Sequence, residues 1–101
     1  MPTDLLKNPH PGEILESEFL EPLNLTRSEV ARKIGVPHQR VSALVLGKSP
    51  VTADMDLRLA KAFGLSEGFW LRLQTEYDLM EARRASGNSL KKIKPLLPMN
   101  A

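Results

Sequence analysis

Side chains that can hydrogen-bond to DNA bases gather within six consecutive residues of this chain. The amide of Gln39 matches the N6 and N7 edge of adenine, while His38 and Ser42 can each donate or accept a hydrogen bond. The methyl group of Ala43 can contact a thymine methyl group. Arg40 lies to one side, where it can reach a phosphate or a guanine. These residue types predict that the segment reads base edges in a major groove.

A second group of residues is suited to the phosphate backbone. Thr26 and Arg27 begin an expected helix, and the N–H groups at a helix N-terminus attract anions. Lys48 and Thr52 lie on the other flank of the base-reading segment. The alternative is that the threonines only cap helices and that the polar side chains are an ordinary solvated surface. The predicted DNA-binding residues are Thr26, Arg27, Pro37, His38, Gln39, Arg40, Ser42, Ala43, Lys48 and Thr52.

The elements that must position these residues form a helix-turn-helix over about residues 26–46. Two short helices joined at Gly35 and Val36 must cross steeply. Ala31 is small where such helices touch, Gly35 tolerates a positive φ, and Val41 can pack back from the second helix. The alternative is a chance pair of helices without DNA binding. In a helix-turn-helix the second helix enters the major groove.

The spacing of apolar residues, together with the residues that start and stop helices, predicts an all-α fold of five helices. Proline opens the first helix and Pro22 is expected to stop it. A capping box of Thr26 and Glu29 begins the second. Thr52 and Ser66 are expected to cap the fourth and fifth. The expected helices cover residues 11–22, 26–35, 37–47, 52–64 and 66–84, and the fourth is expected to turn Leu57, Leu59, Ala60 and Phe63 inward.

The fifth expected helix and the residues after it suggest how the chain associates. Apolar residues on this helix exceed what one face of a small bundle needs, which predicts a homodimer through residues 66–84. Alternatively, Phe69 and Trp70 complete the core of the monomer, and for Trp70 this is the favoured interpretation. The division is then a DNA-binding domain at 1–84 and an extended C-terminal tail at 85–101. Leu96 and Leu97 are expected to pack on the body or on a partner.

Composition limits the other function classes. The chain of 101 residues contains no cysteine, and its two histidines lack a paired metal spacing, so no metal, cofactor or catalytic site is expected. Neither a membrane-spanning run nor a signal peptide is apparent, which favours the cytoplasm. The net charge of +2 conceals a net −4 over residues 1–26 and a net +4 over 27–61. A basic central block suits a polyanion, although a solvated surface is the simpler explanation of charge alone.

The whole pattern resembles the HigA family of antitoxins, a branch of the lambda-repressor-like helix-turn-helix proteins. The resemblance rests on the opening HPGEIL, on Leu25-Thr26, on the Ala31 to Val36 turn, and on the later runs VTAD, LRLAKAFG and FWL. It covers about residues 9–82. The chain differs from the family pattern at Pro37, where Ser or Thr is common, and at Leu46, where Asn is common.

This resemblance implies a five-helix lambda-repressor-like domain and a homodimer that binds double-stranded operator DNA and represses its own operon. It also implies neutralisation of a HigB-type toxin, a small basic ribonuclease. We expect the toxin to dock on the acidic residues of the first segment, which are Asp4, Glu13, Glu16, Glu18 and Glu21. Two alternatives remain. One is a stand-alone regulator of the same fold without a toxin, and the other is a protein-interaction module that has lost DNA binding.

Overall fold

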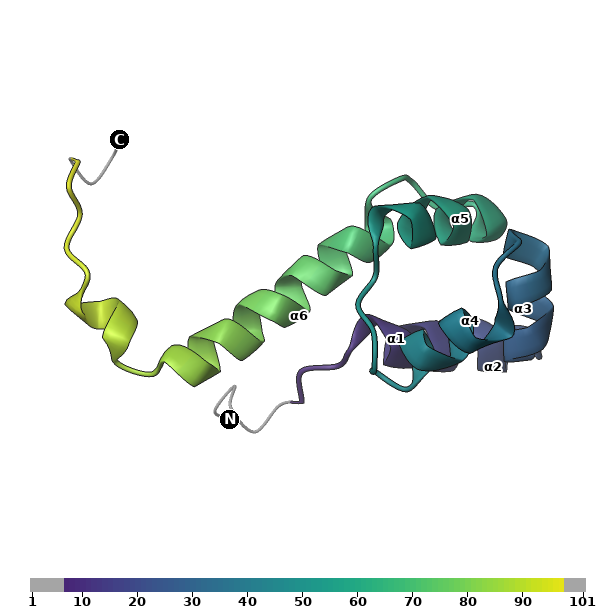
Figure 1. Cartoon of the computed structure of the whole chain (residues 1–101), viewed down its shortest axis with the longest axis horizontal. Coiled ribbons are helices and arrows are strands. Elements are labelled where there is room, and N and C mark those ends of the chain that lie inside the picture. The colour runs from purple at the N-terminus through teal and green to yellow at the C-terminus, as the bar shows by residue number, and fades with distance from the viewer. Residues whose placement is uncertain (1–6, 98–101) are drawn as a thin grey trace.

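The computed structural model describes residues 7–97, and within this range it contains helices and no strand. The elements in chain order are α1 (Pro11–Ile14), η2 (Leu15–Leu20), α2 (Glu21–Leu23), α3 (Arg27–Ile34), α4 (His38–Val45), α5 (Ala53–Phe63), α6 (Phe69–Ser86) and η3 (Ser89–Lys92). The first three are continuous, so the described chain has five main helices, as predicted, followed by a single turn of 3₁₀ helix. Helices α1 to α5 form a body at one end, and α6 leaves it as a rod (Figure 1).

The first helix does not stop at Pro22, contrary to the sequence-based expectation. It continues to Leu23 and ends where Asn24 adopts the left-handed conformation, with φ 58°. The preceding segment η2 is π-helical, and the N–H of Glu21 donates to the carbonyl of Glu16. Proline normally clashes with the carbonyl four residues earlier, and the wider π-helical turn provides a different path for the backbone before Pro22.

The helix-turn-helix has the local geometry that the sequence predicts. The side chain of Thr26 accepts a hydrogen bond from the N–H of Glu29, and the Glu29 carboxylate accepts one from the N–H of Thr26. Helix α3 ends at Gly35, with φ 75°, and the N–H of Val36 then donates to the carbonyl of Ala31. This is a helix end that glycine favours, because a Cβ atom disfavours positive φ.

Helix α5 begins after Thr52, whose side chain accepts from the N–H of Met55, so the predicted cap is confirmed. The inward face differs from the expectation at one position. Leu57 is 48% exposed, whereas Met55 and Leu59 are buried. The helical register set by the cap at Thr52 turns Leu57 toward solvent.

Helix α6 is not capped by Ser66, which corrects another expectation. The helix begins at Phe69. Its N-cap residue is Gly68, with φ 93°, which has no side chain to cap the helix. The buried carboxylate of Asp56 instead accepts hydrogen bonds from the N–H groups of Gly68, Trp70 and Leu71. A residue from α5 therefore satisfies the N–H groups at the start of α6.

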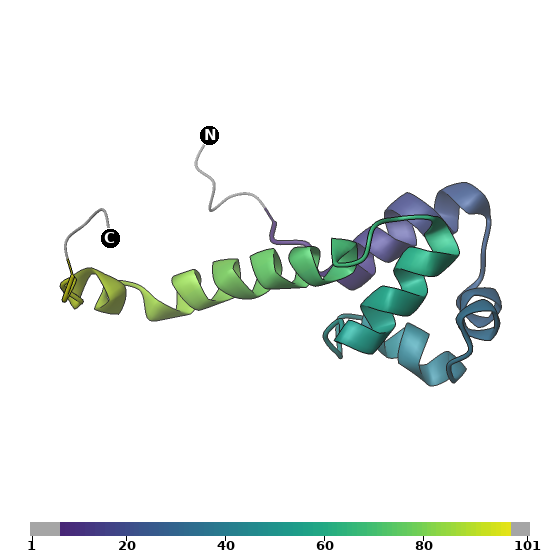
Figure 2. The same ribbon diagram turned by 90° about the horizontal axis from the view of Figure 1, so that it is seen from above.

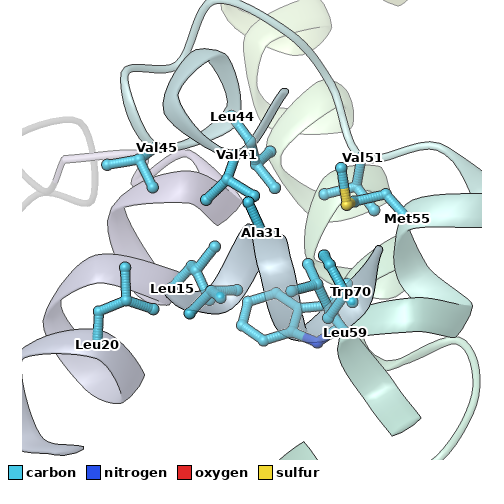
Figure 3. Close-up of a cluster of buried hydrophobic side chains, with 12 residues drawn as sticks. Leu15, Leu20, Ala31, Val41, Leu44, Val45, Val51, Met55, Leu59 and Trp70 are labelled. Carbon is cyan, nitrogen blue, oxygen red and sulfur yellow. The ribbon is translucent and has the colours of Figure 1, made fainter. Parts of the chain in front are cut away.

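The core lies where α1 and η2, α3, α4, α5 and the first turns of α6 meet (Figure 3). Leu15, Val41, Leu59 and Trp70 are fully buried at its centre. The favoured interpretation of Trp70 as a core residue is thus confirmed. Gly12 permits the first helix to approach α4, because a Cβ atom built on Gly12 would lie 1.7 Å from the carbonyl oxygen of Leu44.

The remainder of α6 extends away from the body, and both views show its C-terminal end far from α5 (Figures 1 and 2). Helix α6 ends at Ser86, two residues later than expected, and no further long helix follows among the described residues. Leu96 is fully exposed and Leu97 is exposed, so neither packs on the body of its own chain. Asp4, which was expected to belong to the toxin-docking surface, lies outside the described residues.

Candidate nucleic-acid interface

Helix α4 presents the predicted base-reading residues on the side opposite to its packed face. Its buried residues are Val41, Leu44 and Val45, which hold the helix against the core. His38 and Gln39 are exposed. Ser42 and Ala43 are partly exposed one turn later. Since residues three and four positions apart share a helix face, these four side chains form one surface. Pro37 is the N-cap residue of α4, in an extended conformation.

The beginning of α5 lies beside this surface. A hollow of about 270 Å³ is lined by Gln39, Arg40 and Ala43 from α4, by Ser49, Pro50 and Thr52 from the segment before α5, and by Leu44 and Met55. The structure thus brings together four of the predicted DNA-binding residues, two of them polar and one basic. Lys48 is exposed on the turn after α4, but it does not line the hollow. Thr52, which was predicted to flank the interface, therefore lies beside the base-reading residues of α4.

Arg27 and Ser42 are joined directly across the two helices of the motif. One guanidinium nitrogen of Arg27, Nη1, donates to Ser42 Oγ over 3.1 Å. Its Nε lies 3.7 Å from a carboxylate oxygen of Glu16 in η2. The side chains of Arg27 and Glu16 are both partly buried. Arg27 is thus held between the first helix and α4, and it is not a freely extended surface cation.

The two threonines act as helix caps. The side-chain oxygens of Thr26 and Thr52 accept backbone N–H groups at the starts of α3 and α5. The hydrogen bond from the backbone N–H of Thr26 lowers the pKa of Glu29 below its ordinary value. Both threonines are exposed, so capping leaves them accessible.

Reasoning from the sequence missed two acidic residues as partners of the arginines at the interface. Asp54 lies 3.9 Å from Arg40 and 2.9 Å from Arg58, and Glu16 pairs with Arg27. The Asp54–Arg58 pair has a spacing of four residues, which is a recognisable helical signal. The other two pairs join different helices, so no local spacing indicates them. Arg58 also donates to the carbonyl of Ile34 and thus satisfies the end of α3.

The first helix carries acidic residues with different surroundings. Glu13 accepts a hydrogen bond from the N–H of His10 in a second capping box, and Glu16 pairs with Arg27. Glu18 and Glu21 are exposed. These last two are the acidic residues of this helix that neither cap it nor pair with the helix-turn-helix.

Some other site types find no support in the part of the chain that the structure describes. No group of three or more metal-ligating side chains is found within residues 7–97. In that same range, none of the helices has the length and apolar character needed to cross a membrane.

Comparisons with known proteins agree with this geometry. Residues 17–70 match the protein family described as Helix-turn-helix. The chain is 42% identical over 88 residues to an uncharacterised HTH-type transcriptional regulator of Haemophilus influenzae, a match covering 85% of this chain and 82% of the relative. It is 39% identical over 85 residues to antitoxin HigA-1 of Vibrio cholerae, covering 84% and 80%.

A solved structure provides the same comparison in three dimensions. It is the Pseudomonas aeruginosa antitoxin HigA with the higBA promoter, with a TM-score of 0.83 and 38% sequence identity. The match covers 90% of this chain and 100% of that one. The similarity thus includes the body and most of α6.

Proposed function

Because this chain belongs to the HigA family of helix-turn-helix antitoxins and DNA-binding regulators, we propose that it binds operator DNA as a homodimer, represses its own operon and neutralises a ribonuclease toxin of the HigB type. The family consists of DNA-binding proteins and not of enzymes. We place this activity in the cytoplasm, where operator and toxin would both be available.

The observation that carries the DNA-binding part is the outward surface of α4. Base-reading side chains occupy it, and phosphate-binding candidates flank it on α3 and before α5. The similar HigA of Pseudomonas aeruginosa was solved with promoter DNA. We propose that α4 enters the major groove, with Gln39 and Ser42 toward base edges and Lys48 toward phosphate.

The projecting helix α6 supports the homodimer. Leu79 of α6 is 50% exposed, and Leu90 and Ile93 are exposed after the end of this helix. An isolated helix has little stability of its own in water without tertiary packing. A second copy packed along α6 would cover these side chains and place two α4 helices on one operator. Sedimentation equilibrium of the wild type and of Leu79→Glu tests this, because the variant is expected to dissociate at concentrations where the wild type is dimeric.

The acidic first helix supports toxin binding by charge. Glu18 and Glu21 are exposed there, and the basic partner implied by the family resemblance would complement them. This surface comes from the first helix, whereas the proposed base-reading surface comes from α4. The protein could therefore contact toxin and DNA through different residues.

Two linked experiments test the proposal. The protein is first titrated against DNA from upstream of its own gene and against an unrelated duplex, at several salt concentrations. We expect tighter binding to the upstream DNA and an affinity that falls as salt rises. The protein is then co-expressed with the product of the neighbouring gene and purified through a tag on that product. Absence of binding to the upstream DNA at low salt, with the protein folded, would contradict the repressor function.

A stand-alone regulator without a toxin is the second candidate. The observation in its favour is the 42% identity to the Haemophilus influenzae transcriptional regulator, which exceeds the identity to HigA-1. Operator binding is common to both candidates, so the co-purification decides between them. If the neighbouring product is not a small basic protein that binds this chain, the stand-alone regulator is the better description.

A further inference from the structure

The contact between Arg27 and Ser42 determines whether the Ser42 hydroxyl on α4 acts as a hydrogen-bond donor or acceptor toward other groups. Arg27 Nη1 lies 3.1 Å from Ser42 Oγ, and both residues are partly buried. Among the described residues, Arg27 is the hydrogen-bond partner of this hydroxyl. Ser42 also lies one turn after Gln39 on the outward surface of α4, so it faces any DNA that this surface contacts.

The direction of this hydrogen bond is set by chemistry. A guanidinium group has only donors, so the Ser42 oxygen must accept, and its single hydrogen is left for another partner. The positive charge of Arg27 also opposes the approach of a second N–H donor to the same oxygen. A serine that could otherwise donate or accept therefore becomes a donor toward the outside of the helix.

Glu16 holds the arginine in this arrangement. Its Oε1 atom is buried, has no hydrogen-bond partner within residues 7–97, and lies 3.7 Å from Arg27 Nε. The carboxylate lies near Nε, whereas a different nitrogen, Nη1, binds Ser42. Glu16 is thus a positioning residue for Arg27, and Arg27 is a positioning residue for Ser42.

We propose, on the basis of the operator binding proposed above, that Ser42 is a specificity-determining residue that recognises a hydrogen-bond acceptor on a base edge. In the major groove these acceptors are N7 of either purine, O6 of guanine and O4 of thymine. Cytosine presents only its N4 amino group, which is a donor. The operator position facing Ser42 then disfavours cytosine.

The test is a complete single-base scan of the operator half-site with the wild type and with Ser42→Ala. The position facing Ser42 is the one whose base preference disappears in Ser42→Ala. At this position we expect cytosine to weaken wild-type binding about three- to tenfold, which is the usual range for one net hydrogen bond. Replacing a preferred purine there by its 7-deaza analogue is expected to weaken binding if N7 is the acceptor.

The decisive variant is Arg27→Met, which keeps an unbranched apolar stem and removes every donor. The hydroxyl of Ser42 can then rotate and accept from cytosine N4, so the penalty for cytosine is expected to fall below about twofold. The order of bases at other positions is expected to stay unchanged. Arg32→Met is the matched control, because it removes the same charge from an exposed residue of the same helix. It is expected to weaken binding without changing the order of bases.

Thermal unfolding followed by circular dichroism shows whether each variant is folded. If Arg27→Met does not fold, Glu16→Gln takes its place, and a partial loss of the cytosine penalty is expected. The inference is overturned if Arg27→Met is folded and keeps the wild-type order of bases at this position. The same result with a folded Glu16→Gln, where that variant is used instead, also overturns it. In either case the proposed operator binding stands. A wild-type protein that does not bind its upstream DNA overturns the proposed function and this inference with it.

Discussion

The carboxylate of Asp56 in α5 accepts a hydrogen bond of 2.7 Å from the backbone N–H of Trp70, the central aromatic residue of the core. The same carboxylate accepts from Gly68 and Leu71, so it satisfies three N–H groups at the start of α6. Asp56 therefore connects the helix that flanks the proposed DNA surface to the helix that leaves the body.

Asp56→Ala is expected to lower the free energy of unfolding by about 3 kcal/mol, because it leaves several N–H groups without their charged acceptor. Urea unfolding measures this difference. Asp54→Ala is the control, since Asp54 is exposed and its ion pair with Arg58 is worth about 1 kcal/mol or less. Equal losses for the two variants would show that the carboxylate of Asp56 does not stabilise the start of α6.

Gln39→Ala is expected to reduce discrimination at one operator position by about 1–3 kcal/mol, because the amide is suited to two hydrogen bonds with adenine. Competition binding with operators changed at single base pairs measures the loss. Binding at the other positions is expected to keep its order. If all operators weaken equally, Gln39 contributes no base recognition.

Lys48→Ala is expected to weaken binding to all sequences alike and to reduce the salt slope by about one unit, because one phosphate contact is lost. Titrations at several salt concentrations measure the slope. Lys91→Ala is a suitable comparison, since Lys91 is an exposed lysine of η3, a segment that follows α6 and lies far from α4 (Figure 1). An unchanged slope for Lys48→Ala would place this residue outside the interface.

The double change Glu18→Lys and Glu21→Lys is expected to weaken toxin binding at least tenfold, since it reverses the charge on the exposed acidic surface. Glu13 and Glu16 are left unchanged because they cap the first helix and hold Arg27. Affinity for the toxin is measured by calorimetry, and operator affinity serves as the control. Full toxin affinity in the double variant would show that the toxin docks on other residues.

His10 is expected to make folding stability depend on pH. The residue is 6% exposed, and burial lowers its pKa below the ordinary value of 6.5, because desolvation disfavours the charged form. The unfolded chain therefore binds the proton more readily than the folded chain. Stability from this group is complete above pH 6.5 and falls as the pH drops from there through the folded pKa.

His10→Asn provides the comparison for this effect. Nδ1 of His10 accepts the N–H of Gly12, and an asparagine oxygen can cap in the same place without titrating. Urea unfolding at pH 7.5 and pH 5 is expected to show a larger loss for the wild type than for the variant. An equal loss in both proteins would assign the pH dependence to other groups.

Much of the site follows from local sequence rules. The capping box at Thr26, the left-handed turn at Gly35 and the cap at Thr52 each depend on residues within one helical turn, so spacing alone predicts them. The inward positions of α4 follow in the same way from helical periodicity. The sequence by itself therefore determined the all-α class, the helix-turn-helix and the outward surface of α4.

Only the tertiary structure decided which distant residues meet. The acceptor for the start of α6 is Asp56 and not the nearby Ser66, and Arg27 contacts Ser42 and Glu16 on two other helices. The first helix also passes Pro22 because its backbone widens before the proline. These outcomes depend on how helices pack and how buried polar groups find partners across the core, and periodicity along one helix carries no information about either.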